Sequence, residues 1–335
     1  MQRIEQRGAI GPLAGVAARL FEWGSQWPLP ARADVPAIWQ GFLSAVGAHA
    51  GCSIKAAGAA IAAPTVSLDP ARAVVLFSGG KDGLAVALKL RSEGMFPVLL
   101  HVRGINGGAY VKQEAEAARA VADIAEFPFR ELKVKLAGKS DHIENPTKNL
   151  ALACLAASLA VAWGAGVVAL GLQSEDRWST NPRCGLSDNI DVALPGCAAI
   201  EAMVPGLRLI PASFATDASS LVQIATACPE ALPAISSCMT GARFKRSVRE
   251  ANERRFGVTL LPGRCGSCYK CAIEAAVLAA MDGQVMPKPW ADHCVEKLRR
   301  GAQIVGGLPS LPSVDDAFKV FMSPGLPWRH ALGRP

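Results

Sequence analysis

The chain has 335 residues, of which 50% are hydrophobic and 19% are charged. This size and composition exclude an intrinsically disordered chain and predict a globular protein of one large or two medium domains. The 35 Lys and Arg residues exceed the 28 Asp and Glu residues and give a formal charge of +7. That charge favours phosphate-bearing ligands but is too small for a dedicated nucleic-acid binder.

The ten cysteines are the unusual part of the composition. A short secreted chain would use an even number of cysteines in disulfides, but this chain is long and begins MQRIEQRGAIGPLAG, without an apolar signal core. We therefore expect a cytoplasmic protein whose thiols are reduced and available to bind metal.

The first seventy residues predict an N-terminal helical extension. Apolar residues recur with helical spacing over residues 14–21 and 37–48, and prolines separate the two segments. Residues 57–70 consist mainly of Ala, Pro and Ser, which is typical of a linker. The extension contains no motif with a recognisable chemistry.

From residue 73 onward the sequence alternates between strands and helices. The predicted strands cover residues 73–77, 97–102 and 128–134, and the predicted helices between them cover residues 84–92 and 115–127. Such an alternation predicts an α/β fold with a doubly wound parallel sheet and helices on both faces.

Residues 150–172 carry no formal charge and are long enough to span a bilayer. Gly164 and Gly166 interrupt this stretch, which is rich in alanine before them and in β-branched residues after them. We therefore expect a buried helix followed by a buried strand, and no membrane span.

A glycine-rich turn follows the first predicted strand and opens a helix. It consists of Ser78, Gly79, Gly80, Lys81, Asp82 and Gly83. A helix N-terminus attracts anions, and glycines let a phosphate approach the backbone. A hydroxyl, an ammonium and a carboxylate would then stand beside the phosphate, and the carboxylate suits Mg²⁺. The turn predicts nucleotide binding; the alternative is a strand-to-helix turn that binds no ligand. The turn is not a Walker A loop, because it lacks the Gly-Lys-Ser/Thr of that motif.

A second motif contains Cys265, Cys268 and Cys271, with Cys238 as a candidate fourth member. Thiolates at this spacing can converge on one ion, and a remote cysteine completes a tetrahedral set. The motif predicts Zn²⁺, with an iron–sulfur cluster as the alternative. A closed zinc site of four thiolates would fasten the C-terminal segment to the sheet, because it has no open position at which to activate water.

The strand, the Ser-Gly-Gly-Lys-Asp turn and the helix resemble the pyrophosphate loop of the PP-loop ATP pyrophosphatase superfamily, which has a Rossmann-type fold related to the adenine nucleotide alpha hydrolases. Members cleave ATP between the α and β phosphates and transfer AMP to an oxygen of the substrate. Together with the Cys-Gly-x-Cys-x-x-Cys motif, the turn resembles 7-cyano-7-deazaguanine synthase of queuosine biosynthesis. The resemblance spans residues 72–275.

The resemblance implies ATP with Mg²⁺ at the glycine-rich turn, catalytic roles for Ser78, Lys81 and Asp82, and Zn²⁺ at the four cysteines. Substrate contacts are implied for Lys148, Asn149, Asp176, Trp178, Ser179 and Cys184. We expect Asp82 to position the turn or the metal with a pKa lowered by a neighbouring cation. Four features depart from the family: Gly83 replaces a serine, Lys148 replaces an arginine, the second strand ends in His101-Val102-Arg103-Gly104, and Asp176 is one residue out of step.

These observations predict an ATP-dependent ligase that forms a carbon–nitrogen bond by adenylating a carboxylate of a deazaguanine-like small molecule. We expect a PP-loop domain over residues 71–235 and a zinc-bound helical region over residues 236–335, after the extension of residues 1–70. One alternative is a relative from an antiphage defence system that conjugates the activated group to a partner protein. Another is a non-catalytic module that binds a nucleotide or a partner. A homodimer is compatible with either, whereas nucleic-acid and membrane partners are not expected.

Overall fold

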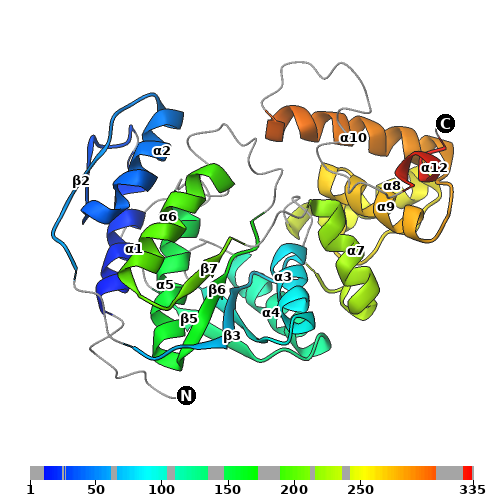
Figure 1. The fold of residues 1–335 in the computed structure, drawn as a ribbon. Coiled ribbons are helices and arrows are strands. Elements are labelled where there is room, and N and C mark those ends of the chain that lie inside the picture. The colour runs from blue at the N-terminus through cyan, green and yellow to red at the C-terminus, as the bar shows by residue number, and fades with distance from the viewer. Residues whose placement is uncertain are drawn as a thin grey trace.

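The structure is a computed structural model in which residues 11–24, 26, 28–61, 66–103, 110–134, 147–172, 189–211, 216–235, 242–306 and 327–333 are described. At its centre lies a sheet of five parallel strands in the order β5-β4-β3-β6-β7 (Figure 1). The strands are β3 (Asp69–Leu76), β4 (Phe96–Arg103), β5 (Phe129–Lys133), β6 (Ala165–Ala169) and β7 (Arg208–Ile210). The predicted α/β architecture with a parallel sheet is confirmed.

Helices cover both faces of the sheet. The core on one side contains α3 (Lys81–Ser92), α4 (Tyr110–Ile124), α7 (Asp217–Ala227), α9 (Tyr269–Met281) and α10 (Lys288–Gly306), of which α7 packs on α3, α9 on α7 and α10 on α9. The core on the other side contains α5 (Lys148–Trp163) and α6 (Ile190–Met203), with α1 (Gly11–Gly24) packed on α5 and α2 (Gln40–Ala50) on α6. Because successive strand residues point to opposite faces, Val75 and Ala169 pack in the first core and Val74 and Val168 in the second.

The long uncharged stretch forms α5 and β6, as the sequence predicted. Gly164 ends the helix with a φ of 66° in the left-handed region, and all five residues of β6 are buried between the two helical layers. No helix among the described residues is long and apolar enough to cross a membrane.

The N-terminal region contains both predicted helices, α1 and α2, and also two strands that the sequence did not predict. These strands, β1 (Arg32–Pro36) and β2 (Lys55–Gly58), form a separate parallel pair. The short 3₁₀ helix η1 (Ala37–Trp39) connects β1 to α2. The strands escaped prediction because β1 contains charged residues and proline, and β2 is short and largely exposed.

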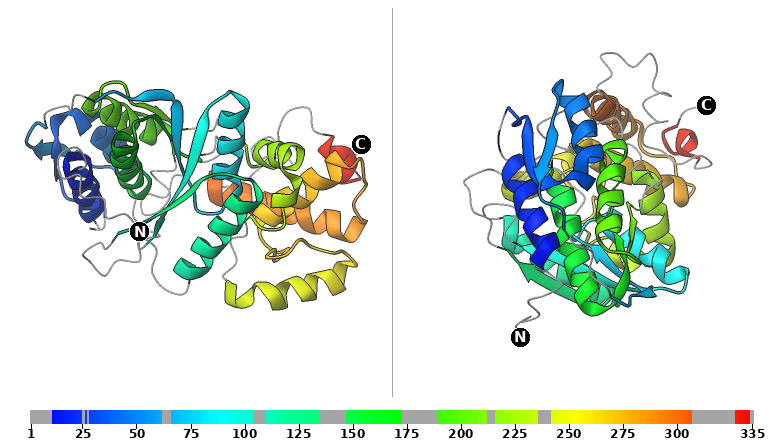
Figure 2. Two further views of the ribbon diagram at one scale, coloured as in Figure 1. Left: turned by 90° about the horizontal axis from the view of Figure 1, so that it is seen from below. Right: turned by 60° about the vertical axis from the view of Figure 1, so that its left-hand side comes forward.

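The N-terminal helices pack in the same core as α5 and α6. The Thr147 hydroxyl, which is buried at the start of α5, donates a hydrogen bond to the Leu20 carbonyl of α1 over 2.7 Å. In the view from below, these helices and the C-terminal helices lie at opposite ends of the molecule, with the sheet between them (Figure 2). The C-terminal end also includes η5 (Pro229–Ala231), α8 (Ala242–Phe256) and α12 (Trp328–Ala331).

Candidate functional site

A cavity of about 320 Å³ lies at the carboxyl ends of β3, β4 and β6. The chain leaves β3 toward β4 and later returns to β6 on the other side of β3. Such a point, where the strand order reverses, is where open α/β sheets bind their ligands. The polar or glycine residues of its wall are Ser78, Gly80, Asp82, Gly83, His101, Glu114, Lys148, Asn149, Gly171 and Lys270.

Most of the predicted site residues in the described part of the chain border this one space. From the glycine-rich turn these are Ser78, Gly80, Asp82 and Gly83, and from the start of α5 they are Lys148 and Asn149. Two members of the turn, Gly79 and Lys81, are not part of the cavity wall. The predicted substrate residues Asp176, Trp178, Ser179 and Cys184 lie outside the described residues.

Close backbone packing determines the shape of the glycine-rich turn. Gly79 has a φ of 83°, and a Cβ there would lie 2.9 Å from the Ala118 amide nitrogen of α4. A Cβ on Gly171, just after β6, would lie 2.8 Å from the Gly83 amide nitrogen. Only glycine allows the turn, α4 and the end of β6 to approach this closely.

Gly83 is enclosed in the same way. A Cβ at this position would lie 2.9 Å from Phe77 Cδ2 and 3.0 Å from the Leu76 carbonyl oxygen. A serine at this position would therefore have to displace the Phe77 ring. The position of the Phe77 ring therefore requires a residue without a side chain at position 83.

Lys81 does not line the cavity, whereas the sequence predicted its ammonium beside a bound phosphate; the ammonium instead pairs with Asp82, which does line it. The residue is 2% exposed, and its Nζ forms ion pairs with Asp217 at the start of α7 and with Asp82 Oδ1, the latter at 3.0 Å. Burial disfavours the charged ammonium, but Asp217 and Asp82 outweigh burial and the pKa of Lys81 is raised. Lys81 therefore links the first turn of α3 to α7.

The expected lowering of the pKa of Asp82 is wrong. Burial raises the pKa of Asp82 although the Lys81 ammonium opposes this shift, and the charge of Asp217 adds to it. The sequence indicated the neighbouring cation but not the second carboxylate, because Asp217 is far away along the chain. Asp82 still borders the cavity and can present its carboxylate to a cation there.

Three residues of the cavity wall with ionisable side chains were not predicted to belong to the site: His101, Glu114 and Lys270. His101 Nδ1 lies 3.0 Å from the Phe77 carbonyl oxygen. Because a carbonyl oxygen only accepts, Nδ1 carries the hydrogen and donates a hydrogen bond to it. Its position at the end of a predicted strand was a usable signal, because carboxyl ends of parallel strands meet at one edge. Lys270 lies inside the cysteine motif, and Glu114 carried no signal.

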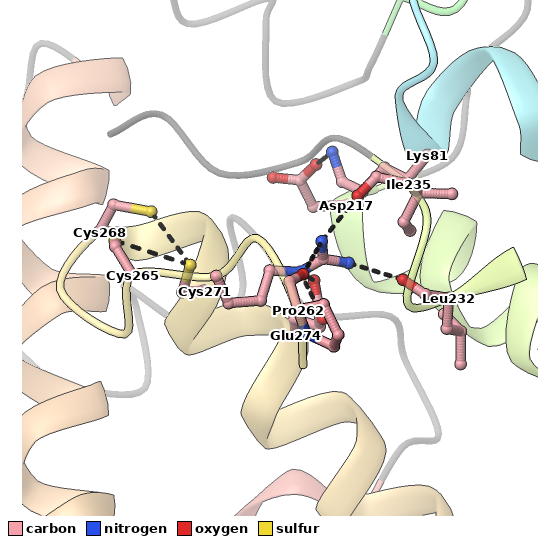
Figure 3. Close-up of polar contacts among 10 residues, drawn as sticks. Lys81, Asp217, Leu232, Ile235, Pro262, Cys265, Cys268, Cys271 and Glu274 are labelled. Carbon is pink, nitrogen blue, oxygen red and sulfur yellow. Dashed lines mark hydrogen bonds and ion pairs between the residues drawn. The ribbon is translucent and has the colours of Figure 1, made fainter. Parts of the chain in front are cut away.

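The three cysteines of the C-terminal motif converge as predicted (Figure 3). Their sulfur atoms lie within 4.8 Å of one another, with 3.5 Å between Cys268 and Cys271 and 3.9 Å between Cys265 and Cys271. Tetrahedral Zn²⁺ with Zn–S bonds of about 2.3 Å holds its sulfurs roughly 3.8 Å apart. The cluster can therefore hold a metal ion, and zinc fits it.

Hydrogen bonds and a tight turn fix the chain around the three sulfur atoms. The Ser267 amide donates to Cys265 Sγ over 3.2 Å, and Gly266 turns the chain with a φ of 70°. Asn252 of α8 donates to the Cys265 carbonyl and to the Ser267 hydroxyl, both at 2.8 Å. The N-terminus of α9 follows Cys268, and its dipole favours thiolate over thiol.

A buried ion pair adjoins the cluster. Arg264 Nε donates to both carboxylate oxygens of Glu274 over 2.8 Å, and both residues are 3% exposed. The other guanidinium nitrogens donate to the Ile235 carbonyl over 2.6 Å and to the Leu232 carbonyl over 2.9 Å. Figure 3 shows these contacts between the cysteines and the Lys81–Asp217 pair. Arg264 directly precedes Cys265, so these hydrogen bonds hold the chain at Ile235 close to the cysteine cluster.

Cys238, the predicted fourth ligand, lies outside the described residues. It follows Ile235 by three positions, and three extended residues span about 10 Å.

Two cysteines outside the cluster are buried thiols. Burial raises the pKa of the Cys197 thiol to about 12, with Glu201 adding to the shift, and that of the Cys228 thiol to about 11, with Glu230 adding to it. Such thiols are protonated and unreactive at neutral pH.

The cavity combines a helix N-terminus, two carboxylates and the side chains of Lys148 and Lys270. This set suits an anionic ligand accompanied by a divalent cation. No protein-family model matches the chain, and no curated protein matches it significantly. The chemistry of the site therefore has to follow from its residues and their arrangement.

Proposed function

We propose that the protein is an ATP-dependent ligase of the PP-loop pyrophosphatase type that adenylates a carboxylate, with a deazaguanine-like acid as its substrate. The cavity carries this proposal, because the glycine-rich turn, Lys148 and Asn149, and Gly171 all border it. The turn is one of the two motifs on which the resemblance to 7-cyano-7-deazaguanine synthase rests, and Lys148 and Asn149 are substrate contacts that the resemblance implies. The three segments come from separate parts of the chain.

The reaction begins with a carboxylate, which is a poor acyl donor because its leaving group would be oxide. A carboxylate oxygen attacks the α-phosphorus of ATP, the bond to the bridging oxygen of the β-phosphate breaks, and pyrophosphate leaves. Ammonia or an amine then attacks the acyl carbon of the adenylate, loses a proton, and expels AMP. The product is an amide, from which a nitrile can follow in a second activation.

The chain's own residues would act mainly on the departing pyrophosphate. The first turn of α3 begins after Gly80, which offers no side chain to cap it, so the turn's amides and the Ser78 hydroxyl can donate to phosphate oxygens. Asp82 would hold Mg²⁺, which supplies positive charge to the phosphates when bound. We assign Asp82 this positioning role rather than that of a general base.

The three cysteines, with Cys238 as fourth ligand, would hold Zn²⁺. A site closed by four thiolates has no coordination position for substrate, so its contribution is to stabilise the fold. Elemental analysis of the purified protein tests this assignment. About one zinc per chain is expected, whereas iron with a brown colour would contradict it and favour a cluster.

A second candidate is a domain that binds nucleotide without turnover. Two observations favour it: Gly83 lacks the family's hydroxyl, and the ammonium of Lys81 is engaged with Asp217. Such a domain would bind ATP and release neither AMP nor pyrophosphate. The two candidates therefore share the binding site and differ in the products.

The deciding experiment measures AMP and pyrophosphate after incubation with ATP, Mg²⁺, ammonia and candidate carboxylates, beginning with 7-carboxy-7-deazaguanine. The ligase yields AMP and pyrophosphate in equal amounts, and Asp82→Ala abolishes both. Asp123→Ala, which removes an exposed carboxylate of α4, serves as the control and keeps full activity. ADP as the product would overturn the proposal, and ATP binding without either product would favour the second candidate.

A further inference from the structure

Lys270 links the cysteine cluster to the cavity. It stands between Cys268 and Cys271 in the first turn of α9 and is half-buried. Lys270 is also part of the cavity wall, as are Ser78 and Asp82 of the glycine-rich turn. The residue thus belongs to the cysteine turn by sequence and to the nucleotide cavity by position.

The turn's own lysine is not available for the role that Lys270 can fill. Lys81 is buried in ion pairs with Asp82 and Asp217 and does not border the cavity. Among the described residues, the cations in the cavity wall are Lys148 and Lys270. Lys270 lies close enough to Asp82 for its charge to oppose the larger effect of burial on that carboxylate.

A lysine in the first turn of a helix is electrostatically unfavourable, because the helix N-terminus is itself positive. No acidic residue stands in the first turn of α9, and the Asp82 carboxylate of the same cavity wall is close enough to interact with the charge of Lys270. Negative charge from the thiolates and from a phosphate would add to this stabilisation. This location is the one that a cation needs if it is to bind an anion in the cavity.

We propose that Lys270 is the cation that binds the pyrophosphate end of the nucleotide, and that the metal held by the cysteines on either side of it sets its position. This inference rests on the proposed ATP binding at the glycine-rich turn. It adds a dependence of nucleotide affinity on the metal, through one side chain. Lys270 therefore takes the part that the sequence suggested for Lys81.

The test titrates magnesium pyrophosphate and magnesium ATP into the zinc-loaded protein and its variants by calorimetry. Lys270→Met should weaken both affinities by about 10- to 100-fold, the loss expected for one hydrogen bond to a charged group. Lys270→Arg should restore most of the affinity. Lys89→Met removes an equal charge from the exposed side of α3 and should have no effect.

The outcomes separate the two proposals. If the wild type binds pyrophosphate and Lys270→Met binds it equally well, the role of Lys270 is refuted while the proposed function stands. If the wild type binds neither pyrophosphate nor ATP, the proposed function fails and the role of Lys270 fails with it.

The link to the metal has its own readout, since coupling between two binding sites is reciprocal. Zinc affinity is measured by competition with a chromogenic chelator, with and without magnesium pyrophosphate. Pyrophosphate also binds zinc directly, and Lys270→Met reports this background. Relative to that variant, pyrophosphate should raise the zinc affinity of the wild type and of Lys89→Met. An equal response of Lys270→Met and the wild type would refute the coupling.

Discussion

The buried Arg264–Glu274 pair offers the sharpest prediction about stability. Arg264→Met removes the guanidinium and leaves the Glu274 carboxylate, 3% exposed, without its cation. It also removes the donors to the carbonyls of Ile235 and Leu232. Breaking a buried pair from one side costs about 3–5 kcal/mol, because an uncompensated charge remains inside. This is a large share of the roughly 5–15 kcal/mol that holds a typical domain folded.

Urea denaturation followed by circular dichroism measures this change in the free energy of unfolding. The double variant Arg264→Met/Glu274→Leu should be more stable than Arg264→Met alone, since it buries no lone charge. Arg300→Met is the control, because Arg300 pairs with Glu296 on the exposed surface of α10. This variant should lose less than about 1 kcal/mol of its free energy of unfolding. A loss for Arg264→Met as small as that of the control would refute the reasoning.

Four further predictions concern the cavity and the thiols. Gly83→Ser should lower stability by about 1–3 kcal/mol without tightening ATP binding, because its Cβ would lie 2.9 Å from an aromatic carbon; thermal denaturation with and without ATP checks this. Gly171→Ala should displace the turn and reduce turnover by up to about a hundredfold, measured as AMP release; unchanged turnover would contradict the packing. Exposed Cys52 should react with iodoacetamide in the native protein, whereas Cys154, whose pKa burial raises well above its usual range, should react only after unfolding, as mass spectrometry of labelled peptides would show. Since burial raises the pKa of Asp82, its carboxylate gains a proton at a higher pH than an ordinary aspartate does; calorimetry at decreasing pH should show affinity for magnesium ATP falling further in the wild type than in Asp82→Asn, which reports the protonation of ATP itself.

The sequence predicted those parts of the fold that local patterns determine. Apolar runs of five or six residues and helical spacing located β3, β4, α3 and α4, and Gly164 marked the boundary between α5 and β6. The same reasoning placed the start of β3 at residue 73 instead of Asp69, because residues 69–72 are polar or only partly buried. It missed β1 because charged residues and proline interrupt that strand, and β2 because it is short and largely exposed.

The candidate site divides along similar lines. The cysteine turn is a local motif, so its convergence followed from spacing alone. The direction of the Lys81 side chain depends on Asp217, which the fold brings to it from α7. The presence of Lys270 in the cavity wall depends on how α9 docks against the glycine-rich turn. Contacts between elements so far apart along the chain leave no pattern in either segment.

The cavity wall runs from Leu76 to Lys270, so most of the chain has to be in place before the cavity exists. A ligand that binds only the complete wall stabilises the sheet, the start of α5 and the cysteine turn together. Thermal stability in the presence of such a ligand would then report the assembly of the whole molecule rather than of one half. If that ligand is the proposed nucleotide, it would favour fully folded copies in a cell over those in which α9 has not docked.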